Sequence, residues 1–198
     1  YRVPGNSDAR AWSRADGALR GVERLRYYIE GGITSIRDTG SDGETPFLLK
    51  EWVNEGRLAG PRVFAAGSVI SGRGGHGGEV EIEGGKPLPA SREASGPDDW
   101  REAVREQFRK GADFIKLTSH FSDDEVKAAI DELIALRVAL IVTQAAIGPA
   151  AHRVVAGRIP LVFAFSGDPV VAGMAESFAR PGGNTTGMSF LALELVGK

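Results

Sequence analysis

The chain has 198 residues, with 24 basic and 26 acidic side chains and no cysteine. A net charge of −2 gives no electrostatic reason to expect a nucleic-acid or membrane partner. The lack of cysteine excludes disulfides, thiolate nucleophiles and cysteine-based zinc sites. Because no apolar run approaches the length of a membrane span and the first residues lack a signal-peptide core, we expect a cytoplasmic product on recombinant expression.

Charged residues are unevenly distributed along the chain. Residues 138–198 carry 7 charged side chains in 61 positions, or about 11%, whereas residues 1–137 carry the other 43, or about 31%. One explanation is that the tail holds the buried strands of a parallel sheet, which read as continuous apolar runs. The other is that the two parts have different origins. We treat residues 1–198 as a single α/β domain with these two parts.

The first part alternates helical and strand patterns. Apolar residues recur at three- and four-residue intervals from residue 8 to residue 30, where two glycines end the segment. The same signals, apolar periods and bounding glycines, predict the other helices and strands of this part. We expect helices at 8–30, 45–57 and 98–110, and strands at 33–37, 62–67 and 113–117.

Residues 68–96 show neither a helical nor a strand period. The stretch contains eight glycines, including four in the run 74–78 around His76. A loop of nearly 30 residues is longer than ordinary connections and is usually a functional lid or disordered. We therefore expect poor order over residues 68–96.

The last helix of the first part has a well-defined start. Ser122 precedes Glu125 by three residues, which is the capping-box spacing, and an apolar stripe follows to Leu136. The remaining elements are shorter. We expect strands at 139–143, 160–165 and 186–190, and helices at 147–157 and 169–179.

About six strands alternating with helices predict an α/β fold with a mostly parallel sheet covered on both faces. The preferred arrangement is a three-layer αβα, doubly wound sheet with the Rossmann-like order 3-2-1-4-5-6. A flavodoxin-like 2-1-3-4-5 core with an added strand is the second choice. A partial (β/α) barrel is the third, and its unpaired sheet edges would favour self-association.

Three segments resemble the metal-dependent, prolidase-like amidohydrolases. They are GITSIRDTG at 32–40, GPRVFAAGSVISGRGGHG at 60–77 and GADFIKLTS at 111–119. With the helices between them they cover about residues 8–136, and they are similar to consecutive βα units from the front half of that (β/α)8 barrel.

The resemblance places Lys116 where these enzymes carry a carboxylated lysine that bridges two metal ions. The family's other ligands are missing, because its His-x-His pair would precede Tyr1 and the later histidines and aspartate are replaced. One lysine cannot hold a divalent metal that needs three or four protein ligands. His76 and His120 stand in no metal-ligand spacing. We therefore regard Lys116 as a vestigial ligand position and expect no metal and no cofactor.

Residues 138–198 resemble the periplasmic substrate-binding proteins of bacterial ABC transporters, through IVTQ, IPLVFAFSGDPV, ARPGGN and ELVGK. The resemblance implies the last strands of a first lobe, in which ligands bind at the carboxyl ends of strands. Five residues stand at such ends and are candidate contacts for a small polar or anionic ligand. They are Thr143, Gln144, Ser166, Gly167 and Asp168.

The two resemblances together favour an engineered chimera of TIM-barrel and binding-protein fragments, with no natural catalytic activity and a fusion point within about 131–139. Two alternatives remain. One is a vestigial metal-dependent amidohydrolase using Lys116 with His76 or His120. The other is a weak binder of a small polar or anionic molecule.

Overall fold

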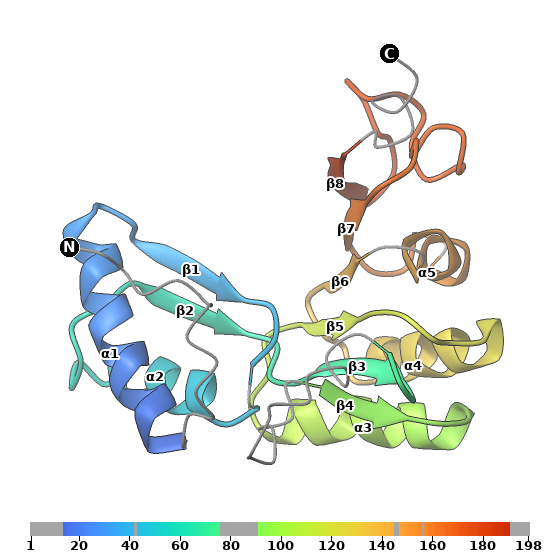
Figure 1. Cartoon of the computed structure of the whole chain (residues 1–198). Helices are drawn as coiled ribbons and strands as arrows, with labels where there is room; N and C mark the ends of the chain where they lie inside the picture. The colour runs from blue at the N-terminus through green and yellow to red at the C-terminus, as the bar shows by residue number, and fades with distance from the viewer. Residues whose placement is uncertain (1–13, 42, 76–90, 145–146, 156, 191–198) are drawn as a thin grey trace.

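The computed structural model describes residues 14–41, 43–75, 91–144, 147–155 and 157–190. These ranges hold five helices and eight strands (Figure 1). The helices are α1 (Arg14–Glu30), α2 (Thr45–Asn54), α3 (Pro97–Arg109), α4 (Asp123–Ala135) and α5 (Ile147–Val155). The strands are β1 (Ser35–Asp38), β2 (Arg62–Ala65), β3 (Val69–Gly72), β4 (Ser91–Ala94), β5 (Ile115–Leu117), β6 (Ile141–Gln144), β7 (Leu161–Phe165) and β8 (Thr185–Ser189).

All strand pairs within the described ranges are parallel. A six-stranded sheet has the order β4-β3-β5-β6-β7-β8, and β1 and β2 form a separate pair. The chain passes from one sheet to the other between β2 and β3. A backbone hydrogen bond also joins the two sheets, since the N–H of Asp113, just before β5, donates to the carbonyl of Ala65 at the end of β2. The expected α/β class, with about six mostly parallel strands flanked by helices, is confirmed.

The strand order 3-2-1-4-5-6 is wrong, and so is the flavodoxin-like order. The expected third strand, β5, pairs with the expected fourth, β6, so the strands from β5 to β8 follow one another in chain order. The doubly wound order requires one reversal of direction between the third and fourth strands. No such reversal occurs here, and the successive helices α3, α4 and α5 pack against one another. This winding is that of the partial (β/α) barrel.

A kink separates β2 from β3. Gly67 has a φ of +73°, and a Cβ atom there would collide with the side chains of Gln107 and Phe47. The side-chain carbonyl of the fully buried Gln107 accepts a hydrogen bond from the N–H of Ser68 at 3.0 Å. Glycine is required at such a position because other residues rarely adopt positive φ.

The expectation that residues 68–96 lack secondary structure is wrong at both ends. β3 and β4 pair in parallel there, with Val69 opposite Ser91. Four-residue strands surrounded by glycines are too short to show an alternating pattern in sequence. Residues 76–90, including His76, lie outside the described residues.

The helix expected at 169–179 is also absent, because the segment forms turns. The Asp168 carboxylate accepts hydrogen bonds from the N–H groups of Val170 and Val171, as at the start of a helix. Gly173 then adopts a φ of +71°, and left-handed glycines end helices. The segment therefore stops after a single turn.

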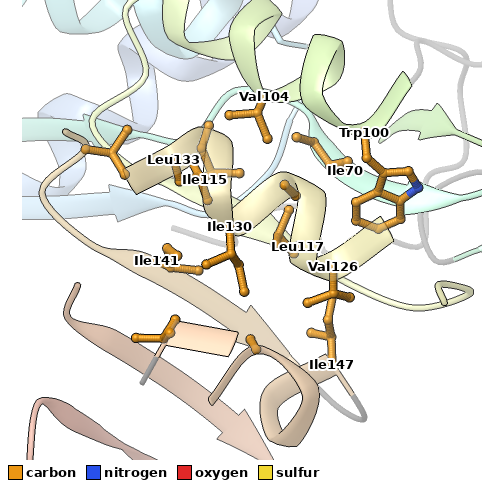
Figure 2. Close-up of a cluster of buried hydrophobic side chains, with 14 of the residues drawn as sticks. Ile70, Trp100, Val104, Ile115, Leu117, Val126, Ile130, Leu133, Ile141 and Ile147 are labelled. Atoms are coloured by element: carbon orange, nitrogen blue, oxygen red, sulfur yellow. The ribbon is translucent and has the colours of Figure 1, made fainter. Parts of the chain in front are cut away.

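The largest apolar cluster lies between the sheet and helices α3, α4 and α5 (Figure 2). Strand residues Ile70, Ile115, Leu117 and Ile141 are at most 1% exposed. The helices contribute Trp100, Val104, Val126, Ile130, Leu133 and Ile147, all fully buried. A smaller cluster of Ala66, Phe114 and Val142 occupies the opposite face of the sheet. We call this opposite face the inner face, since it corresponds to the interior of a barrel.

No helix in the described ranges is long and apolar enough to cross a lipid bilayer.

Candidate functional site

Lys116 lies on the inner face of the sheet. Its neighbours in β5, Ile115 and Leu117, point into the helix-covered cluster, so Lys116 faces the other way, beside Phe114. Val142 is its partner in the β5–β6 register. Phe114 and Val142 belong to the inner apolar cluster, so the lysine is flanked by apolar side chains.

The surroundings of Lys116 favour its neutral form. Burial lowers the pKa of the Lys116 amine below its ordinary value, and the negative charge of Asp38 partly offsets this effect. Three other lysines each form an ion pair: Lys50 with Asp113, Lys110 with Glu106 and Lys127 with Asp131. Lys116 forms no ion pair within the ranges that the structure describes. The fraction of neutral amine is therefore raised at this position.

Asp38 ends β1, and its side chain also shapes the turn that follows. One carboxylate oxygen accepts a hydrogen bond from the N–H of Gly40 at 3.2 Å. On the neighbouring residue, the Arg37 guanidinium lies 5.8 Å from the centre of the Phe114 ring. Sequence reasoning missed Phe114 as a neighbour of Lys116. The spacing of Phe114 and Lys116, two residues apart on one strand, was the available signal.

The described residues do not form a metal centre. Within them there is no group of three or more His, Asp or Glu side chains that could hold a metal ion. His120 follows β5 on an exposed loop with a φ of +59°. A structural or catalytic zinc site needs at least three protein ligands, so Lys116 and its described neighbours do not fit such a metal.

Four of the five candidate ligand residues from the second part have described side chains, and these lie in different surroundings. Thr143 pairs with Leu117 and faces the helices, where its buried hydroxyl has no hydrogen-bond partner among the described residues. Ser166 is exposed, and the carbonyl of Gly167 accepts a hydrogen bond from the hydroxyl of Ser189 at 2.7 Å. The carboxylate of Asp168 accepts backbone hydrogen bonds in its own turn. Gln144 ends β6, and its side chain lies outside the described part.

Comparison with known proteins relates the chain to hydrolases. Ochratoxinase from Aspergillus niger is 27% identical over 133 residues, which cover 52% of this chain and 27% of that enzyme. The crystal structure of a prolidase complexed with N-methylphosphonate-L-proline is 27% identical, with a TM-score of 0.63, over 77% of this chain and 42% of the prolidase. The chain is similar in sequence and in fold to prolidase-like amidohydrolases.

A Xaa-Pro dipeptidase structure supports the same fold, with a TM-score of 0.66 over 83% of this chain and 44% of that chain, at 24% identity. No protein-family model matches the chain. The chain spans about a quarter of the length of the ochratoxinase and less than half of these two solved amidohydrolases.

The expectation of an engineered chimera without catalytic activity is contradicted by these relatives. The match to the prolidase spans 77% of 198 residues, about 152, which exceeds the 137 residues before Val138. The structural likeness to amidohydrolases therefore continues beyond the expected fusion point. The expectation that the chain is not an enzyme is corrected for the same reason, since the relatives are hydrolases. The uneven charge misled the prediction because buried parallel strands carry few charges.

Proposed function

We propose that this chain acts in amide-bond hydrolysis, as an amidohydrolase related to prolidases and ochratoxinase. The observation that carries the proposal is the position of Lys116. It lies in the last of the three segments that resemble the amidohydrolases, on the inner face of a partial barrel, in an apolar setting that lowers its pKa. Residues near the carboxyl ends of barrel strands are where (β/α)8 enzymes carry their catalytic groups.

The role of Lys116 follows from its protonation state. A lysine with a lowered pKa has a larger fraction of neutral amine near pH 7, and its lone pair can accept a proton from an attacking water. Because the described residues do not fit a metal, we assign no step to one. Asp38 contributes negative charge near the amine, which would stabilise the ammonium ion after proton transfer.

The test is hydrolysis of Xaa-Pro dipeptides and of ochratoxin, the compounds named for the relatives. The purified chain is incubated with each compound, and the released amino acid is quantified by mass spectrometry. We expect Lys116→Ala to lower the rate by at least about a hundredfold, the usual size of an acid–base contribution. Lys127→Ala is the matched control, because Lys127 lies on the exposed side of α4 in an ion pair with Asp131. It should keep the rate within about twofold.

Two results would contradict the proposal. One is the absence of hydrolysis of both the Xaa-Pro dipeptides and ochratoxin by the wild-type chain. The other is a Lys116→Ala variant that retains the wild-type rate.

We further propose, on the motifs of residues 138–198, an ancestry shared with transporter substrate-binding proteins for that part alone. An alignment of homologues covering the whole chain would test this. Relatives in which amidohydrolase-like sequence runs through both parts would refute it.

A further inference from the structure

A cavity of about 610 Å³ lies between α1, β1 and α2. Figure 1 shows the two helices together beside β1 and β2, at the amino-terminal end of the described chain. The volume falls within the range of roughly 300–1,000 Å³ that is usual for small-molecule sites. Lys116 and the five candidate ligand residues of the second part are not among the lining residues.

One face of α1 forms a long wall of this cavity. The lining residues of α1 recur at intervals of three and four positions, as on one side of a helix. They are Gly17, Arg20, Gly21, Arg24, Leu25 and Tyr28. The opposite wall includes Ile36 from β1 and Leu49 from α2, so the cavity has an apolar floor.

Positive charge gathers at the same cavity. Arg20 and Arg24 lie one turn apart on α1 and line the space together with the carboxylate of Asp38. Arg37 also lines it, but its guanidinium lies over Phe114 on the inner face and adds no charge here. Within the ranges that the structure describes, Arg24 forms no ion pair. By contrast, Arg26 on the same helix is paired with Glu30 at 2.7 Å. The Ser41 hydroxyl, also in the lining, is buried without a hydrogen-bond partner among the described residues.

This combination differs from an ordinary packing void. Empty voids between elements are lined by apolar groups, whereas here guanidinium groups and a hydroxyl share the space with an apolar floor. Arginine binds carboxylates with two parallel hydrogen bonds. We propose that the cavity binds a small organic acid, with its carboxylate at Arg20 and Arg24 and its apolar body against Leu25, Ile36 and Leu49.

The probe is 3-phenylpropionate, which has a carboxylate, an aromatic body and no amide bond. Its affinity is measured by calorimetric titration at low salt, beside the neutral analogue 3-phenylpropan-1-ol. We expect saturable binding of the acid, and about tenfold weaker binding of the alcohol, because the alcohol lacks the charge that pairs with arginine. Binding of the acid should weaken as salt is raised.

Substitutions of the arginines of α1 test whether the acid binds in this cavity. Arg24→Gln should weaken binding about tenfold, and Arg20→Gln with Arg24→Gln should weaken it further. Arg26→Gln is the control on the same helix and should leave the affinity unchanged. Lys116→Ala should also leave it unchanged, so this result is separate from hydrolysis. The proposal is overturned if the acid does not bind saturably, if the alcohol binds equally well, or if the double variant keeps the wild-type affinity.

Discussion

Lys116 combines an ordinary side chain with an unusual position. On an exposed strand face it would be a solvated cation, but in this fold it faces Phe114 and Val142 and is half-buried. The cost of desolvating an ammonium group is what lowers its pKa. The burial that we propose makes Lys116 a proton acceptor therefore also lowers the stability of the folded chain while the amine is charged.

This cost predicts a pH-dependent stability. The folded-state pKa of Lys116 lies below the unfolded value of 10.5, so the unfolded chain binds more protons between the two values. Stability should rise with pH through that window, and the destabilising effect should be absent above it. Lys116→Met should therefore raise the melting temperature at pH 7 by about 2 °C, with a smaller effect at pH 10.5.

Thermal unfolding followed by circular dichroism measures this difference. Lys127→Met serves as the control, because its ammonium group is exposed and paired. An equal gain for Lys116→Met at both pH values would show that removing the charge is not the cause.

At the scale of elements, α4 is the clearest case of local sequence deciding local structure. Both halves of its capping box are present: the Ser122 hydroxyl accepts from the N–H of Glu125, and the Glu125 carboxylate accepts from the N–H of Ser122. Glu125 also accepts a hydrogen bond from the N–H of Gly96, at the start of α3. A single carboxylate thus joins the beginnings of two neighbouring helices.

Loss of this cap should be measurable. Ser122→Ala removes the hydroxyl that satisfies the N–H of Glu125, and we expect it to lower the free energy of unfolding by about 1 kcal/mol. Urea denaturation gives the value. Ser166→Ala, at an exposed position after β7, should change stability by less than about 0.5 kcal/mol. Similar losses for both variants would argue against a specific role for the cap.

At the scale of the whole molecule, the inner face of the sheet is only partly covered. Phe64 and Met188, which face this side, are 44% and 67% exposed. In a closed barrel such side chains pack against those of the other strands. β8, which carries Met188, is the last strand in the order of its sheet. Exposed apolar groups beside a sheet edge favour association.

We therefore expect this chain to self-associate with increasing concentration. Met188→Lys should shift the population toward the monomer, because a charge on this strand opposes burial. Sedimentation velocity at several concentrations measures the shift. Val171→Lys, which adds the same charge to an 86% exposed residue outside the strands, should have little effect. Equal shifts in both variants would point to a general charge effect instead.

Sequence by itself determined most helices and strands, because caps, glycines and apolar periods act over a few residues. The capping box at Ser122 and the β-branched strand ending at Asp38 are examples. It also placed Lys116 by family resemblance. It failed at 169–179, where an apolar pattern suited a helix but Gly173 adopts a left-handed conformation. It also failed at β3 and β4, which form by pairing with each other.

Tertiary structure alone decided the strand order, the face on which each strand residue lies, and the cavity between α1, β1 and α2. These features depend on contacts between residues far apart in the chain, such as Asp113 with Ala65 and Leu117 with Thr143. A strand pattern is compatible with several neighbours, so the sequence left doubly wound and barrel orders open. The β5–β6 pairing selected the barrel order, and with it the apolar setting that lowers the pKa of Lys116.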